Sequence, residues 1–139
     1  MLGKNLFLSG LVVMGFFALG HLGGFLQAAY STRHDSAMAD LTKVMREHKT
    51  SLLGFQPSIL DFREYFSLNF SILLLLASAI GFAMIATGGD QWVIIRTLSP
   101  VYVVAMLLLL GTSFYFSVVQ GIILCPIIAI LFGLAWWIA

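Results

Sequence analysis

The sequence predicts an all-α integral membrane protein, a four-helix bundle with a short amphipathic helix between spans 1 and 2. Hydrophobic residues make up 60% of the 139 residues and charged residues only 9%, whereas soluble domains are about 25% charged. Four apolar runs each approach or exceed the length of about 20 residues that a helical span requires. Most of the charges lie instead between the first two runs. A water-soluble fold would have too few polar side chains to cover its surface.

The apolar runs give the approximate limits of the spans. We expect spans over residues 6–30, 60–87, 92–116 and 118–138, with an amphipathic segment at 35–53. These elements fill most of the sequence, so we treat residues 1–139 as a single transmembrane domain. They leave no room for a soluble catalytic domain.

The first run has two interpretations, a membrane span or a long signal peptide that ends near Gln27, Ala28 and Ala29. The apolar region of a signal peptide is about 7 to 15 residues long, and small residues precede its cleavage site. The run here is longer than that, and Gln27 is not small. We therefore favour the span.

The segment at 35–53 shows the period of a helix. Apolar or weakly polar side chains recur at steps of three and four residues: Met38, Leu41, Met45, His48 and Leu52. Asp35 or Ser36 can cap the start of this helix. We expect it to lie on the membrane surface. A solvated connection between spans is the interpretation we favour, and a lid over a pocket that faces the bilayer is the alternative.

The remaining spans have recognisable ends. Pro57 suits the first turn of the second span, and Gly88, Gly89 and Asp90 interrupt the chain before the third. Lys and Arg are more numerous between the first two spans than on the opposite face of the membrane. The positive-inside rule therefore places that connection in the cytoplasm and both ends of the chain outside.

His21 is the one ionisable side chain well inside a predicted span. A polar group at that depth needs a partner within the protein, so it marks either a site or a packing contact. The packing interpretation is a neutral imidazole hydrogen-bonded to a serine or a backbone carbonyl of the next helix. Haem ligation by two histidines would need a second one at similar depth, but His34 and His48 lie in the polar segment. We predict no cofactor and no metal site.

The densest polar cluster lies at the start of the second span. A carboxylate of Asp61 or Glu64 near His21 could act as a general acid or base, which makes these three the catalytic candidates if the protein is an enzyme. The candidate ligand-binding residues are Asn69, Ser71 and Tyr102. The simpler interpretation is that the acids stabilise the positive end of their own helix. The sequence lacks the motifs of metalloproteases and serine hydrolases.

Gly20 and Gly24 have the small-xxx-small spacing that lets two helices approach closely. Tight packing inside the bundle is the interpretation we favour, and a seam between two copies of the chain is the alternative. Seven Lys and Arg residues form no basic stripe, so we do not expect a nucleic-acid partner. The partners we expect are the lipid bilayer and either other membrane subunits or a second copy.

Short motifs resemble a family of small bacterial four-span membrane proteins that has no assigned activity. The motifs are Gly20-His21 in the first span, Ser58-Ile59-Leu60-Asp61-Phe62 at the second, and Phe114-Tyr115-Phe116 at the end of the third. The resemblance implies a four-helix bundle in the bacterial inner membrane.

The sequence favours a structural or accessory membrane protein that packs against itself or against a larger membrane complex, because its helices contain glycine and serine patterns without a complete catalytic motif. The alternative is a membrane-embedded enzyme or binder for a lipid-like or apolar small molecule, with a pocket near His21, Asp61 and Glu64.

The threading through the membrane can be tested by labelling single cysteines from each side in a Cys125→Ser background. With four spans, a cysteine at Ser36 and one at Asp90 lie on opposite sides of the membrane. An impermeant thiol reagent should therefore modify only one of them in sealed vesicles. Modification of both from the same side contradicts the four-span topology.

Overall fold

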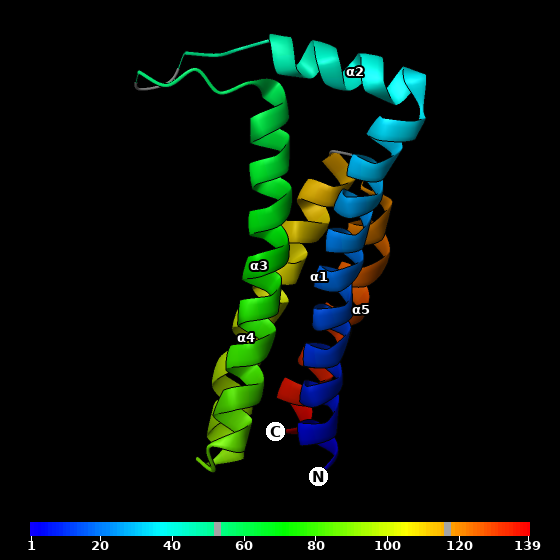
Figure 1. The fold of residues 1–139 in the computed structure, drawn as a ribbon. Coiled ribbons are helices and arrows are strands. Elements are labelled where there is room, and N and C mark those ends of the chain that lie inside the picture. Colours follow the sequence, from blue (N-terminus) through cyan, green and yellow to red (C-terminus); the bar gives the residue numbers. More distant parts are fainter. Residues whose placement is uncertain (52–53, 116–117) are drawn as a thin grey trace. The chain divides into compact units, whose positions relative to one another are not determined.

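The computed structural model describes residues 1–51, 54–115 and 118–139. In this part the chain forms five helices (Figure 1): α1 (Leu2–His34), α2 (Ser36–Glu47), α3 (Ile59–Ala86), α4 (Gln91–Tyr115) and α5 (Val119–Ile138). Four of them contain segments long and apolar enough to cross a membrane: Leu2–Ala28, Ile59–Ala86, Gln91–Tyr115 and Val119–Ile138. The all-α, four-span fold with a short helix after the first span is confirmed, and the apolar spans imply contact with the lipid bilayer.

The first helix is longer than the run at 6–30. It begins at Leu2 and continues to His34, because no glycine or proline interrupts the chain after Tyr30. Asp35 then adopts an extended backbone, with φ of −122°, and starts α2. The second span begins at Ile59 rather than at Pro57, so Pro57 precedes the helix and does not occupy its first turn.

Two compact units divide the described chain. One comprises Met1–Phe17 and Leu74–Ala139, and the other comprises Ala18–Leu73. Helices α1 and α3 each contribute residues to both units.

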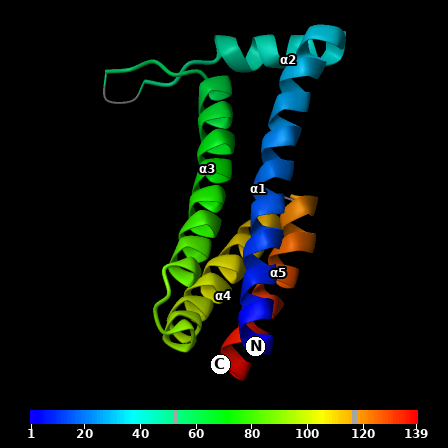
Figure 2. The ribbon, with the colours of Figure 1, turned by 60° about the horizontal axis from the view of Figure 1, so that its bottom comes forward.

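An aromatic cluster holds the first unit together. The ring centroid of Phe132 lies 5.3 Å from that of Phe7 and 4.5 Å from that of Tyr102. These rings come from α5, α1 and α4, and α4 and α5 pack side by side in opposite directions (Figure 2). Aromatic pairs at such distances contribute about 0.5 to 1.5 kcal/mol beyond the area they bury. The cluster therefore joins the first span to the last two.

Two polar contacts connect the second half of α3 to its neighbours in this unit. Ser78 donates a hydrogen bond to the Leu11 carbonyl over 2.9 Å, and the Tyr102 hydroxyl donates to the Ala77 carbonyl over 2.9 Å. Both acceptors are backbone carbonyls of another helix, so these side chains link helices in the way expected of polar residues in membrane bundles.

Close approach of helices in the first unit depends on Gly10. A Cβ placed there would lie 2.9 Å from two ring atoms of Phe132. The ring has no room to withdraw, because it is fully buried between Phe7 and Tyr102. Gly10 thus allows α1 to pack directly on the Phe132 ring.

Replacing this glycine should overpack the cluster. We expect Gly10→Ala to lower the free energy of unfolding by about 1 to 3 kcal/mol in detergent-solubilised protein. Gly133→Ala is the matched control, because its added Cβ would meet Val103 at an ordinary 4.0 Å. Equal stability of the two variants, measured by chemical or thermal unfolding, would show that the Phe132 ring does not restrict α1.

Candidate functional site

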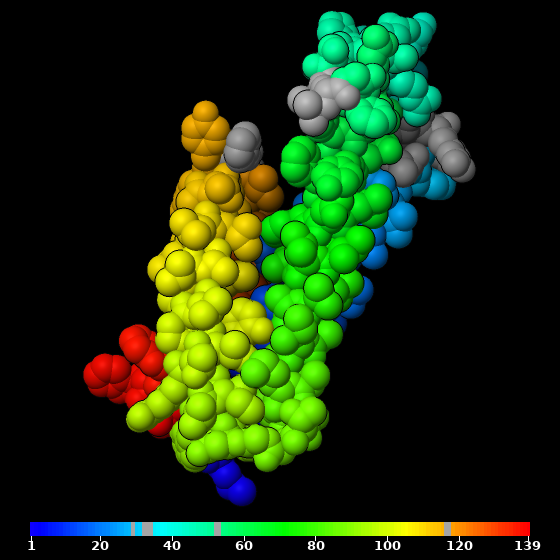
Figure 3. Space-filling model, turned by 90° about the vertical axis from the view of Figure 1, so that its left-hand side faces the viewer, coloured from blue at the N-terminus to red at the C-terminus, as the bar shows by residue number. Residues whose placement is uncertain are grey.

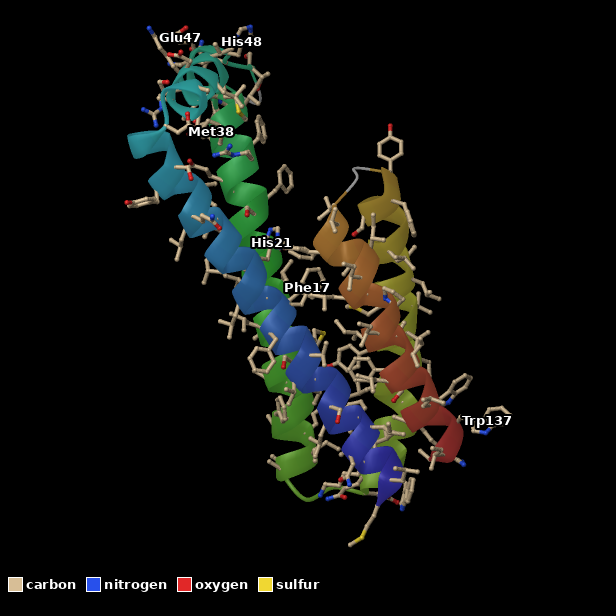
Figure 4. The ribbon with its side chains drawn as sticks, turned by 90° about the vertical axis from the view of Figure 1, so that its right-hand side faces the viewer. Phe17, His21, Met38, Glu47, His48 and Trp137 are labelled. Carbon is tan, nitrogen blue, oxygen red and sulfur yellow. The ribbon has the colours of Figure 1, made fainter. Side chains whose placement is uncertain are left out.

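The candidate site in the second unit is centred on His21. Its Nε2 lies 3.1 Å from Ser67 Oγ on α3, and the tautomer decides which of the two donates. The Phe70 ring meets the imidazole edge to face, with centroids 4.9 Å apart. Figure 4 shows His21 extending from α1 toward α3. The hydrogen bond to a serine of the next span, expected from the sequence, is therefore present.

This His–Ser pair has the elements of a nucleophile and a base, but its surroundings favour packing. A nucleophilic serine needs an oriented base and donors for the developing oxyanion. Ser67 lies within α3, where the helix uses the nearby backbone N–H groups for its own hydrogen bonds. Among the described residues, no carboxylate hydrogen-bonds to the imidazole.

Asp61, in the first turn of α3, forms a capping box with Ser58, which precedes the helix. Its Oδ2 accepts hydrogen bonds from the Ser58 backbone N–H and from Ser58 Oγ, both over 2.8 Å, while the Asp61 N–H donates to Ser58 Oγ over 3.1 Å. Reciprocal bonds of this kind satisfy the donors that a helix start leaves unpaired. Arg46 and Lys49 also attract this carboxylate. The contacts of Asp61 thus favour the helix-stabilising interpretation.

The other candidates make contacts mostly within their own helices. The Asn69 amide donates to the Tyr65 carbonyl over 2.8 Å, and the Ser71 hydroxyl donates to the Ser67 carbonyl over 3.2 Å. Tyr102 belongs to the first unit and bonds Ala77 there. Glu64, partly exposed, has no hydrogen-bond partner among the described residues. The structure therefore brings His21 to Ser67, not to a described carboxylate.

The short helix α2 is capped as expected and ends earlier than the apolar pattern indicated. Asp35 Oδ1 accepts from the Ala37 N–H over 2.9 Å, which confirms Asp35 as the cap. Thr42 is buried on this helix, whereas Leu41 is 51% exposed. His48 ends the helix instead of continuing it, and Leu52 lies outside the described residues. The apolar pattern therefore located the helix, and the exposure of Leu41 is compatible with a face that contacts the membrane surface.

Backbone pairing fastens α2 to the start of α3. The Ile59 N–H donates to the His48 carbonyl, and the Thr50 N–H donates to the Pro57 carbonyl, each over 3.0 Å. Within this unit, Figure 3 shows the side chains of α2 and the following loop gathered at the beginning of α3. The residues that follow α2 thus pair with those that precede α3, and this pairing holds the end of α2 beside the start of α3.

Gly20 and Gly24 do not mark a close contact within the described chain. A Cβ built on either glycine, or on Gly23, meets no described atom within 4 Å. Tight packing at Gly20 and Gly24 therefore stays a prediction, whereas Gly10 and Gly81 of the first unit do sit at close contacts. A seam with a second copy stays a prediction.

A cavity that the sequence did not predict lies in the first unit. Its volume is about 390 Å³, and its lining residues are Met1, Lys4, Asn5, Gln91, Trp92 and Ile95. None of these was among the candidate site residues. The one signal in the sequence was a lysine and a tryptophan near the starts of two spans, which is also the usual pattern of membrane anchors.

The described residues contain no group of three or more His, Cys, Asp or Glu side chains able to hold a metal ion. Comparison of the chain with protein-family models, with curated proteins and with solved structures finds no match.

The His21–Ser67 bond can be measured with a double-mutant cycle. Loss of one partner leaves the other unpaired, so His21→Leu and Ser67→Ala should each destabilise the protein by about 1 to 3 kcal/mol. The double variant should lose less than the sum, and His21→Asn should retain more stability than His21→Leu because an amide still offers a hydrogen bond. Additive losses in unfolding measurements would show that the two side chains are not coupled.

The capping box has its own test. Asp61→Ala should cost about 1 kcal/mol and speed hydrogen exchange at the first amides of α3. Glu64→Ala is the control, since Glu64 has no described hydrogen bond in the same helix start. Equal exchange in both variants would contradict a specific role of Asp61 as a cap.

Proposed function

We propose that this multi-pass membrane protein is a small accessory protein that packs, through the glycine face of α1, against a second copy of itself or a helix of a larger membrane complex. The glycine face consists of Gly20, Gly23 and Gly24. The observation that supports this role is that an added Cβ at each of them meets no described atom. Backbone exposed in this way lets another helix approach closely, which is how membrane helices associate.

A polar side chain continues this face. Gln27 follows Gly20 by two helical turns and is exposed, so its amide lies on nearly the same side of α1. Amides that face a partner helix form interhelical hydrogen bonds that contribute about 0.6 to 2 kcal/mol in membranes. Small residues with an adjacent amide thus favour a protein partner over lipid at this face.

A second copy is the partner we expect first. The Gly-xxx-Gly spacing of Gly20 and Gly24 is typical of dimers in which two identical helices cross at their glycines. Both copies use the same surface in such an interface, so the assembly is a closed dimer and does not extend further. On the family resemblance of the Gly20-His21 and Ser58–Phe62 motifs, we place this assembly in the bacterial inner membrane.

The alternative, an enzyme or a lipid binder centred on His21, Asp61 and Glu64, has less support. The Asp61 carboxylate is hydrogen-bonded to Ser58 and the His21 imidazole to Ser67. Both side chains therefore already make contacts that stabilise the fold. If His21 transfers a proton in a reaction, then His21→Asn should fold and yet fail to complement a deletion strain, because an amide cannot be protonated near neutral pH.

The accessory role predicts a loss of assembly without a loss of folding. Because the described chain leaves open space at these glycines, Gly20→Leu or Gly24→Leu should keep the stability of the monomer. The same variants should weaken co-purification of two differently tagged copies by about tenfold or more, since the bulky side chain separates the helices.

Gly111→Leu is the matched control, because Gly111 also meets no described atom within 4 Å and lies on α4. Self-association that survives Gly20→Leu as well as it survives Gly111→Leu would exclude the α1 seam. Retention of a larger native complex by Gly111→Leu and its loss in Gly20→Leu, with no pairing of tagged copies, would assign the face to another subunit.

A further inference from the structure

We propose that the cavity at the starts of α1 and α4 binds the phosphate of an anionic headgroup at the membrane surface. The cavity, about 390 Å³, is lined by side chains from the first turns of both helices. Its volume falls within the range of about 300 to 1,000 Å³ that is typical of small-molecule sites. Two of the helices long and apolar enough to cross a membrane begin at these residues, which puts the cavity at the level where lipid headgroups meet water.

The polar part of the lining offers hydrogen-bond donors to an anion. Lys4 contributes an ammonium group, and Asn5 and Gln91 contribute side-chain amides. Lys4 is partly buried, and no described carboxylate forms an ion pair with it. A lysine beside apolar surface is stabilised when a counter-charge approaches its ammonium group. A phosphate accepts hydrogen bonds from all three donors and supplies that charge.

The apolar part of the lining suits the boundary between headgroup and acyl chain. Ile95, only 1% exposed, contributes an apolar side chain to the lining. The Trp92 indole packs close to Gly3, where a Cβ would lie 3.4 Å from the ring. Indole rings favour this level of a membrane because they combine an apolar ring with one N–H donor. The lining thus combines apolar side chains with one cation.

Two charged residues near the cavity, Asp90 and Arg96, form hydrogen bonds outside it. Asp90 Oδ1 accepts from the Trp92 backbone N–H over 3.0 Å, so it caps α4. Arg96 Nε donates to the Ala139 carbonyl over 2.7 Å. Neither residue is part of the lining. Lys4 is therefore the lining side chain whose charge recognises an anion.

The test follows the fluorescence of Trp92 in the full-length protein with Trp136→Phe and Trp137→Phe, which leaves a single indole. Three compounds are titrated into the detergent-solubilised protein: dioleoyl phosphatidylglycerol, dioleoylglycerol and glycerol 3-phosphate. We expect the phospholipid to shift the emission and dioleoylglycerol, which lacks the phosphate, to have little effect. If glycerol 3-phosphate shifts the emission and binds as tightly as the phospholipid, the cavity binds phosphate, and the ligand is a soluble phosphate compound instead of a lipid.

Substitutions locate the site. Lys4→Gln should weaken phospholipid binding by about tenfold, because it removes a charge-assisted hydrogen bond, and Gln91→Leu by about fivefold. Lys43→Gln, on the exposed side of α2, is the control and should bind like the parent. If Lys4→Gln does not fold, Gln91→Leu and the comparison of ligands still decide.

Equal effects of dioleoylglycerol and phosphatidylglycerol would overturn the proposal. Equal losses of binding in Lys4→Gln and Lys43→Gln would do the same. They would show that binding depends on the net charge of the protein and not on a specific contact with Lys4. These outcomes leave the α1 seam untouched, since that seam is measured by association of tagged copies.

Discussion

The absence of water in the bilayer core is the constraint on which this fold depends. Every backbone N–H and C=O there must be paired within the protein, so the spans are helical throughout. The same constraint acts on side chains. His21 pairs with Ser67, Ser78 with the Leu11 carbonyl, and Tyr102 with the Ala77 carbonyl. Each of these three groups also connects two helices, so the cost of burying it is offset by a contact that defines helix position.

The sequence predicted the parts of the fold that depend on length and local chemistry. Apolar runs of the required length gave the four spans, and Asp35 followed by a helical period gave the cap of α2. The serine partner of His21 could also be anticipated, because a histidine in hydrocarbon needs a hydrogen bond from a neighbouring helix. The spans and the cap depend on one segment of the chain, and the serine partner depends on the requirement that a histidine in the membrane be hydrogen-bonded.

Features that depend on which helices meet could not be predicted in the same way. Gly10 and Gly20 look alike in the sequence, yet Gly10 faces the Phe132 ring and Gly20 meets no described atom. Asp61 looked like a candidate acid, but the serine three residues earlier forms a capping box with it. That Ser-x-x-Asp pattern was a usable signal. The cavity at Lys4 and Trp92 joins residues far apart in the chain, and no local pattern brings them together.

The contact between Phe7 and Phe132 has a consequence for biosynthesis. The first ring belongs to α1, which is synthesised well before α5, the helix that carries the second ring. During synthesis the surface of α1 at Gly10 therefore lacks its contact with the Phe132 ring until α5 has been inserted. Over that interval the first span must be held by lipid or by the insertion machinery, and the arrival of α5 completes the unit in one late step.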